Sequence, residues 1–265
     1  MKTSPRTLKS LAVLAAAGLA LTACSSGGSD ADPSEGGETG LSLVSEGQLT
    51  VCSEIPYEPF EFTDENGDIV GFDMDIATEI AADLGLEREI IADSFESIQS
   101  GLSFGKCDIS ISSISITEER KGNMDFSDPY MADDLTLIAA SGSDVTDLDS
   151  AKDKKVGVQD GTTGKKYAEE NGISPVGFES TGLLLQALKS GTVDAALGNA
   201  SVLGYGIKDE ADISRVEDFA TGEELGVSIE KGDAAMLEAV NGTLQRLTDS
   251  GEMDELKAKW FGETE

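Results

Sequence analysis

From residue 49 onward, short runs of strand-forming residues alternate with segments of helical periodicity. Residues 49–53 form a run typical of a strand. Across 72–84, in contrast, Ile76, Ile80 and Leu84 recur every four residues, which predicts one apolar face of a helix. Such alternation indicates βα units, in which helices cover a mainly parallel sheet. The pattern therefore restricts the chain to an α/β fold.

The alternation falls into two series, of which the first continues to about residue 112. Strands are predicted near 89–92 and 108–112, and between them lies a helix whose apolar face carries Phe95, Ile98 and Leu102. These elements, together with the two described above, are enough for one compact α/β lobe.

The second series begins after an apolar run at 135–139. Its predicted elements are strands near 155–159, 193–197 and 225–229, and helices near 163–170, 181–189 and across Met236, Val240, Leu244, Leu247, Leu256 and Trp260. We therefore expect two lobes, each a mixed, mainly parallel sheet flanked by helices. Lobe one comprises 47–139 plus 230–265 and lobe two comprises 140–229, so the chain crosses between them twice.

The first 24 residues have the three-part build of an export signal. Three basic residues precede an apolar run at 11–21, which is shorter than the ~20 residues needed to cross a bilayer. The run ends in Leu21-Thr22-Ala23-Cys24, which resembles the bacterial lipobox, so we expect cleavage after residue 23 and acylation of Cys24. The alternatives are an uncleaved membrane anchor and an ordinary secretory signal, and each of the three places the protein outside the cytoplasm.

The segment after Cys24 is almost entirely Ser, Gly, Asp, Glu, Thr and Pro up to position 40, so we expect a flexible tether over 24–46. Without the three basic residues of the signal, the chain keeps 16 Lys and Arg against 51 Asp and Glu, a formal charge of −35. This charge excludes nucleic acid as a partner and repels anionic lipid. Contact with the membrane is therefore expected through the N-terminal lipid alone.

Two cysteines, Cys52 and Cys107, remain after Cys24 is assigned to the lipid. Cys52 falls late in one predicted strand and Cys107 opens another, so parallel neighbours would offset them by several residues at about 3.3 Å each. A disulfide requires Cα atoms within about 7 Å. We therefore expect two buried free thiols, although export would also permit a bridge.

Six short strings occur in a fixed order along the mature chain. They are Tyr57-Glu58-Pro59-Phe60-Glu61-Phe62, Gly71-Phe72-Asp73-Met74-Asp75, residues 112–120 (SSISITEER), Phe126-Ser127-Asp128-Pro129-Tyr130, residues 157–163 (GVQDGTT) and Lys259-Trp260-Phe261-Gly262. Together they resemble the polar amino-acid family of periplasmic-type solute-binding proteins, which includes lysine/arginine/ornithine, histidine and glutamine binders. The resemblance implies a two-lobed periplasmic-binding-protein-like fold of type II, an amino acid held between the lobes, and delivery to the membrane subunits of an ABC importer.

Arg120 is the strongest candidate for ligand binding. It follows a Ser/Thr cluster, and the fork of an arginine matches a carboxylate bidentately. The resemblance implies that it clamps the ligand's α-carboxylate, with Ser112 at the cleft edge and Ser113 and Ser115 nearby. An exposed arginine, or one paired with Glu118, is the alternative.

The string Gly161-Thr162-Thr163 lies between a predicted strand and a predicted helix. Free backbone N–H groups and the helix dipole favour an anion at that point. We expect Thr162 and Thr163 to meet the ligand's carboxylate from lobe two, although a threonine there can equally act as an N-cap.

The resemblance also assigns residues to the ligand's side chain. Tyr57 and Phe95 match an aromatic pair on either side of it, although Phe95 could equally be a core residue. Glu54 falls where binders of basic amino acids carry an acid, and Gln159 lies on the lobe-two side. An acid and an amide suit a side chain rich in hydrogen-bond donors. We take Glu54 to be a solvated carboxylate with an ordinary pKa.

Asn199 departs from the family, which has an aspartate for the ligand's ammonium at the matching position. An amide lacks the charge of that aspartate, and charge-assisted hydrogen bonds are about twice as strong as neutral ones. The ligand's amine could be modified, the affinity could be modest, Glu54 could supply the charge, or the alignment could be shifted by one residue.

Catalysis and pure interaction are the competing functions. Exported cyclohexadienyl dehydratases resemble the same family, but the chain has no histidine and therefore no His-based general base. A ligand-reporting interaction protein would fit the lipid anchor equally well. We expect a monomeric binding protein with no catalytic residue, no metal and no cofactor.

Overall fold

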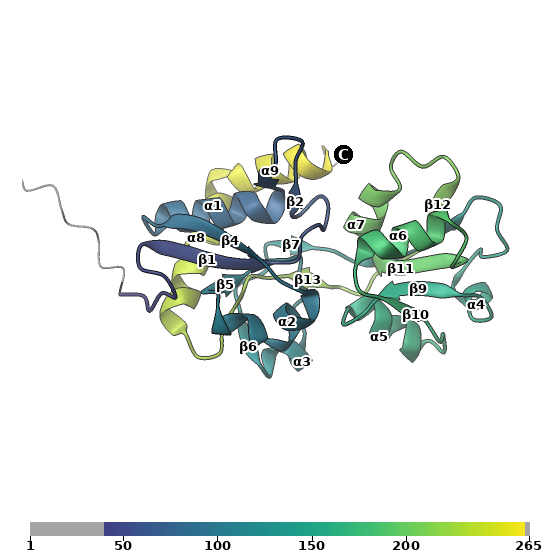
Figure 1. Ribbon diagram of the computed structural model, residues 1–265, viewed down its shortest axis with the longest axis horizontal. Helices are drawn as coiled ribbons and strands as arrows, with labels where there is room; N and C mark the ends of the chain where they lie inside the picture. Colours follow the sequence, from purple (N-terminus) through teal and green to yellow (C-terminus); the bar gives the residue numbers. More distant parts are fainter. Residues whose placement is uncertain (1–39, 263–265) are drawn as a thin grey trace, which may run out of the picture. The chain divides into compact units, whose positions relative to one another are not determined.

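The computed structural model describes residues 40–262 and contains two five-stranded sheets (Figure 1). The first sheet has the strand order β4 (Glu87–Ala92), β1 (Gln48–Ser53), β5 (Ile109–Ser110), β14 (Ser228–Glu230) and β6 (Met124–Phe126). The β4–β1 and β1–β5 pairings are parallel, and the other two are antiparallel. We call this sheet and the helices packed on it lobe one.

The second sheet repeats this arrangement. Its order is β10 (Val176–Phe178), β9 (Val156–Gln159), β11 (Ala195–Asn199), β8 (Leu135–Ala140) and β12 (Ile213–Phe219). The β10–β9 and β9–β11 pairings are parallel, and β8 pairs antiparallel with both of its neighbours. This sheet and its helices form lobe two. The predicted mixed sheets are confirmed, with a larger antiparallel share than expected.

Neighbouring residues of a strand point to opposite faces of its sheet. In both sheets, residues on each of the two faces are buried in a hydrophobic cluster. In β1, Val51 joins the core beneath α1 and α8, whereas Cys52 joins a second cluster with Phe95 and Ile98. The helices of lobe one are α1 (Phe72–Asp83), α2 (Phe95–Ser100), η1 (Leu102–Gly105), α3 (Glu118–Lys121), α8 (Ala234–Ser250) and α9 (Glu252–Phe261). A short hairpin, β2 (Phe62–Thr63) with β3 (Ile69–Val70), precedes α1.

Lobe two is built in the same way. In β8, Leu137 packs in one cluster and Ile138 in another, so helices are needed on both sides of the sheet. Those helices are α4 (Leu148–Ala151), α5 (Thr163–Glu170), α6 (Thr181–Lys189) and α7 (Ala200–Gly206). The side chains of Thr162 and Ser180 cap α5 and α6 by accepting from the third backbone N–H that follows. The predicted helices at 163–170 and 181–189 are therefore confirmed.

Two antiparallel strands carry the chain between the lobes. They are β7 (Met131–Ala132) on the way out and β13 (Glu224–Leu225) on the way back, and Figure 1 shows both between the two sheets. Paired crossing strands of this kind allow one lobe to rotate against the other about a narrow hinge.

The strand order moves both expected lobe boundaries. The run 135–139 belongs to β8 of the second sheet, although it was expected in lobe one. Residues 228–229 begin β14 of the first sheet, although they were expected in lobe two. Each crossing thus lies several residues earlier in the chain than predicted, because an apolar run does not reveal which sheet its strand joins.

The expected tether also ends earlier than residue 46. Leu41 and Leu43 pack against the core of lobe one, and the backbone N–H of Val44 donates to Asp108 at 2.7 Å. Residues 41–46 are therefore held on lobe one. The export signal, Cys24 and most of the tether lie outside the described residues.

The expectation of two free thiols is wrong, since Cys52 and Cys107 form a disulfide with Cα atoms 5.7 Å apart. Cys107 does not open a strand but lies in the turn between η1 and β5. This turn passes the face of β1 from which Cys52 projects, so both sulfurs lie in the cluster with Phe95 and Ile98.

No helix within residues 40–262 has the length and apolar character needed to cross a membrane.

Candidate functional site

Four of the predicted site residues lie at the carboxyl ends of strands that pair in parallel. Glu54 follows β1 directly and Ser112 comes just after β5 in lobe one, while Gln159 ends β9 and Asn199 ends β11 in lobe two. Ligands of open α/β sheets bind in the crevice outside such strand ends. The region between these ends is therefore the candidate site.

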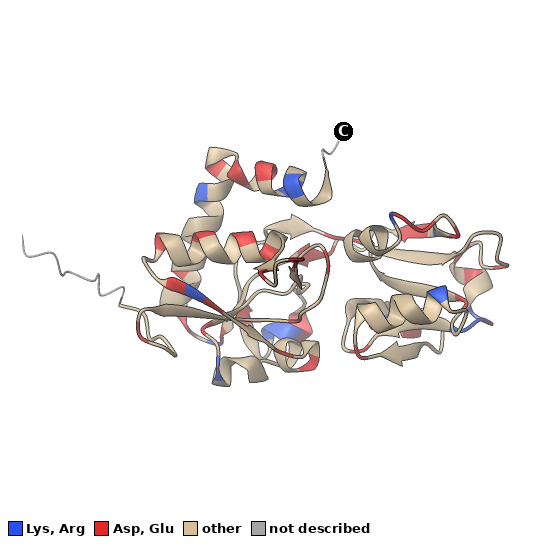
Figure 2. Cartoon of the chain, turned by 45° about the horizontal axis from the view of Figure 1, so that its top comes forward, with Lys and Arg blue, Asp and Glu red and all other residues tan. Residues whose placement is uncertain are grey.

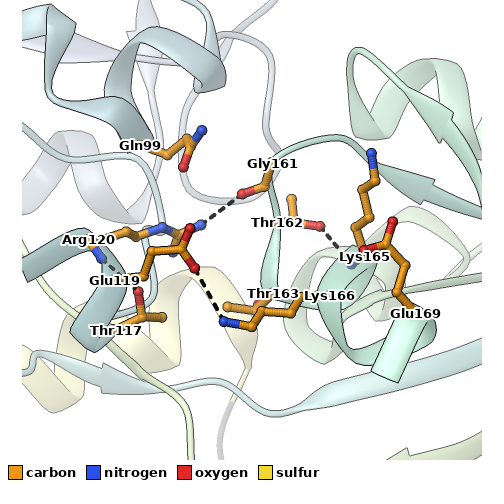
Figure 3. A pocket seen from close by; sticks show the side chains of 10 residues that line it. All are labelled: Gln99, Thr117, Glu119, Arg120, Gly161, Thr162, Thr163, Lys165, Lys166 and Glu169. Atoms are coloured by element: carbon orange, nitrogen blue, oxygen red, sulfur yellow. Dashed lines mark hydrogen bonds and ion pairs between the residues drawn. The ribbon is translucent and has the colours of Figure 1, made fainter. Parts of the chain in front are cut away.

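Arg120 lies on α3 and is 6% exposed. Its guanidinium donates from Nη1 to the Ser115 carbonyl at 2.7 Å and from Nη2 to the Gly161 carbonyl at 3.1 Å. The second bond joins lobe one to lobe two (Figure 3). Burial lowers the pKa of Arg120 to about 10, while the negative charge of Glu223 opposes this shift, so the side chain stays cationic at neutral pH.

Neither alternative for Arg120 is observed, because its side chain is buried and Glu118 pairs instead with Lys121. Phe95 is a core residue of lobe one and also lies beside Arg120. Its ring centroid lies 5.4 Å from Cζ of Arg120. Leu102, expected on the same apolar face, is 74% exposed because the α-helix ends before it.

The three serines have separate partners. The Ser112 hydroxyl donates to Glu61 at 2.6 Å and accepts from the backbone N–H of Glu54. Ser113 adopts a φ of 47°, its N–H donates to Asp73 at 2.6 Å, and its buried hydroxyl has no partner among the described residues. Ser113 therefore holds a free polar atom next to the site.

Ser115 of lobe one and Thr163 of lobe two both bind the carboxylate of Glu223. The hydroxyl of Ser115 and the hydroxyl of Thr163 both donate to Oε2 of Glu223, each at 2.7 Å. Thr162 caps α5 and donates to the Gln159 carbonyl at 2.8 Å. Thr162 therefore acts as the N-cap, and Thr163 is the threonine whose side chain contacts a carboxylate.

Glu54 and Gln159 bind each other across the lobes. Nε2 of Gln159 donates to both carboxylate oxygens of Glu54 at 2.8 Å, and Oε1 of Gln159 accepts from Thr181 at 2.7 Å. Glu54 is 8% exposed. The pKa of Glu54 is raised to about 7, chiefly by burial. The hydrogen bond from Gln159 opposes this increase, and the charge of Glu179 adds to it. The expectation of a solvated carboxylate with an ordinary pKa is therefore wrong.

Tyr57 lies against this acidic end of the site. Its ring is buried, and burial, followed by the charges of Glu54 and Asp133, raises the pKa of its hydroxyl well above the ordinary value. It lines a cavity of about 320 Å³ with Thr181 and Tyr205. Phe95 lies instead beside Arg120, so the pairing of the two rings around one ligand side chain stays a prediction.

Asn199 is 6% exposed, and its amide donates to the Asp133 carbonyl at 3.4 Å. The Asp133 carboxylate, 5% exposed, accepts from both the backbone N–H and the hydroxyl of Ser201. Burial raises the pKa of Asp133 to about 6 against those two bonds, and Glu223 adds to the increase. An acid thus lies beside Asn199.

Two cavities of very different volume adjoin these residues. One of about 400 Å³ opens beside Arg120, Gly161 and Thr163 (Figure 3), while a space of only about 10 Å³ remains among Tyr57, Gln159 and Asn199. The smaller space has about the volume that one water molecule needs. A ligand that takes the place of Gln159 beside Glu54 must break this contact between the lobes.

Glu223, Asp133 and Thr181 contact the predicted site but are missed by sequence reasoning. Glu223 and Asp133 lie next to the crossing strands, and Thr181 opens α6. Acids are too frequent in this chain for any one to stand out, and Thr181 matches a helix start. Position beside a crossing strand is the one sequence signal that could have pointed to the two acids.

Residues 49–263 match the family of bacterial extracellular solute-binding proteins, family 3. The chain belongs to this family. It is 31% identical over 260 residues to the probable histidine-binding protein of Neisseria gonorrhoeae, covering 94% of each chain. It is 35% identical over 226 residues to the lysine/arginine/ornithine-binding periplasmic protein of Escherichia coli, covering 80% of this chain and 87% of that one.

Solved structures confirm the two-lobed fold of the family. An ancestral arginine-binding protein bound to arginine has a TM-score of 0.77 at 36% identity and covers 82% of this chain and 99% of its own. An amino acid ABC transporter substrate-binding protein from Streptococcus pneumoniae, bound to L-arginine, gives 0.76 at 32% identity, with 81% and 94% covered. An ancestral amino acid-binding protein, described as a precursor of cyclohexadienyl dehydratase, gives 0.74 at 35% identity, with 81% and 95% covered.

Proposed function

We propose that this protein captures a basic amino acid between its lobes and delivers it to the membrane subunits of an ABC importer. The observation that carries the proposal is the buried pairing of Glu54 with Gln159 opposite Arg120. A side chain with a guanidinium or ammonium group would replace the amide of Gln159 as the partner of Glu54 and would supply the positive charge that the amide lacks.

The charges around the site support a cationic ligand. Among residues 40–262, Arg120 is the one buried cation, whereas the buried acids are Glu54, Glu61, Asp73, Asp108 and Asp133. Figure 2 shows the same excess of acidic residues across the helices and loops of both lobes. Buried charges are stable when they are paired, so a ligand with one carboxylate and two cationic groups would suit Arg120 at one end and the acids at the other.

The relatives support the same ligand class, since those described above are named for histidine, lysine, arginine and ornithine. A thermal-shift screen of the mature protein, freed of bound ligand by unfolding and refolding, tests the proposal. Arginine, lysine or ornithine should raise the melting temperature more than glutamine does. If no amino acid stabilises the fold, the proposal fails.

The ancestral precursor of a dehydratase among the similar structures makes catalysis the second candidate function. We propose binding without turnover, because the chain has no histidine and because Glu54, the leading acid of the cleft, is already held by Gln159. Incubation with prephenate and arogenate separates the two functions. Turnover of either compound at a rate that Glu54→Gln abolishes would establish the enzyme.

We also propose that the mature protein is a monomer held outside the cytoplasm by a lipid on Cys24. The apolar run at 11–21, just before Cys24, is too short to cross a bilayer, so attachment would depend on acylation. Cys24→Ala should release the protein from membranes or leave the precursor unprocessed. A mature-sized product that stays membrane-bound in this variant would rule out the lipid.

A further inference from the structure

Glu223 reaches both lobes with one oxygen atom. It lies immediately before β13, and its Oε2 accepts from Ser115 of lobe one and from Thr163 of lobe two, each at 2.7 Å. Its other oxygen accepts from Thr221 at 3.3 Å. One carboxylate on the crossing segment therefore fastens the two lobes together.

Thr163 is predicted to meet the ligand's carboxylate, and Ser115 is predicted to lie nearby. A hydroxyl has one proton and can donate to one acceptor at a time, so Ser115 and Thr163 cannot serve Glu223 and a ligand together. Arg120 is near enough for the charge of Glu223 to stabilise its cationic form, and its guanidinium donates to the backbone carbonyls of Ser115 and Gly161. The hydroxyls of Ser115 and Thr163 are thus engaged within the protein, while Arg120 keeps further N–H donors.

We propose that Glu223 is an internal carboxylate that takes the place of the ligand's carboxylate and that the ligand must displace. This inference rests on the proposed function, because it requires a ligand with a free α-carboxylate. Other contacts between the lobes support it, since Gln159 of lobe two donates to Glu54 of lobe one and Arg120 of lobe one donates to Gly161 of lobe two.

Displacement makes Glu223 a determinant of affinity and selectivity. An amino acid with a free carboxylate restores the two charge-assisted bonds that Glu223 gives up, whereas an amino-acid amide has no charge to restore them. Glu223 therefore lowers the affinity for amino acids whose carboxylate displaces it, whereas a carboxyl-blocked ligand leaves Glu223 in place. It also favours closed lobes before any ligand arrives.

Calorimetric titration of Glu223→Gln with arginine and with arginine amide tests this role. The carboxamide keeps the shape of the side chain but accepts weaker hydrogen bonds, so the affinity for arginine should rise roughly tenfold. The affinity for arginine amide should stay constant or fall, because this doubly charged ligand loses an acid nearby. Glu224→Gln is the matched control, since Glu224 is exposed, adjacent and of equal charge.

Small-angle scattering of the ligand-free proteins gives a second measurement. Glu223→Gln should have a larger radius of gyration than wild type and Glu224→Gln, because the lobes lose a shared acceptor. If Glu223→Gln is unstable, Glu223→Asp shortens the reach to the two hydroxyls and should change both measurements in the same direction.

The inference is overturned if arginine binds Glu223→Gln with unchanged or lower affinity, because Glu223 would then stay in place or bind the ligand's ammonium. A similar gain for arginine and its amide would also overturn it. A wild-type protein that binds no amino acid would instead refute the proposed function, and this inference would fall with it.

Discussion

Arg120 and Glu54 lie at two ends of one interlobe site, and the protein treats their buried charges differently. Arg120 is surrounded by carbonyl oxygens, with the charge of Glu223 nearby, and its pKa of about 10 leaves it ionised. Glu54 has an amide as its partner, and its pKa of about 7 leaves it part protonated. The cation is compensated by the protein itself, whereas the acid lacks a positive partner that a ligand could bring.

The comparison predicts different mutational effects at the two ends. Changes at the Arg120 end should affect every amino acid, because all share the α-carboxylate. Changes at the Glu54 end should distinguish cationic from neutral side chains, since only the former gain from the acid.

Arg120→Ala should give the largest effect. It leaves the ligand's carboxylate desolvated without its charged partner, a loss of about 2–5 kcal/mol in binding free energy for all ligands. Arg120→Lys, which keeps the charge but not the fork, should lose less. Titration calorimetry of variants with normal melting temperatures measures both. Binding within threefold of wild type in Arg120→Ala would remove Arg120 from the site.

The pH dependence of arginine binding should reveal the contribution of Glu54, at the other end of the site. A cationic side chain holds Glu54 ionised and lowers its pKa in the complex, so binding at a pH below the free pKa of about 7 releases a proton. The affinity should therefore fall as the pH drops below 7, approaching about tenfold per pH unit.

Glu54→Gln is the control for this profile, because Asp133, with a pKa of about 6, also titrates in the range. The variant should lose the part of the slope that begins at pH 7. An identical slope in Glu54→Gln would show that another group carries the pH dependence.

Asn199→Asp should give the smallest effect on binding affinity. It should strengthen binding, whereas Arg120→Ala weakens it. If Asn199 meets the ligand's ammonium, the added charge should strengthen every free α-amino ligand by about 1 kcal/mol, with N-acetylarginine unaffected. The neighbouring acid Asp133 limits the gain by like-charge repulsion. Weaker binding of all amino acids would indicate that the natural ligand lacks a free α-ammonium at this point.

Helices whose apolar residues recur at regular spacing could be predicted from the sequence. The helices at 163–170 and 181–189 were correct to the residue, because each follows a capping residue and has regular apolar spacing. Sheet membership could not be read in this way. The strand at 135–140 is apolar on both faces, and this is equally consistent with either sheet.

The residues of the candidate site were predictable where a strand end or a string of the family marked them. Their partners were not, because contacts such as Glu54 with Gln159 join positions far apart in the chain. Glu223 has no local pattern and acquires its role only when two lobes meet around it. The Cys52–Cys107 bridge was missed because the turn before β5 was mistaken for the strand itself.

Titration calorimetry of wild type and Glu54→Gln with arginine and citrulline at pH 7.5 tests the central claim most directly, since citrulline has the same shape as arginine without the side-chain charge. We predict that wild type prefers arginine by at least about tenfold and that Glu54→Gln loses most of this preference, while Arg120→Ala weakens both ligands alike. Equal affinity of wild type for arginine and citrulline, or a preference unchanged in Glu54→Gln, would contradict the account.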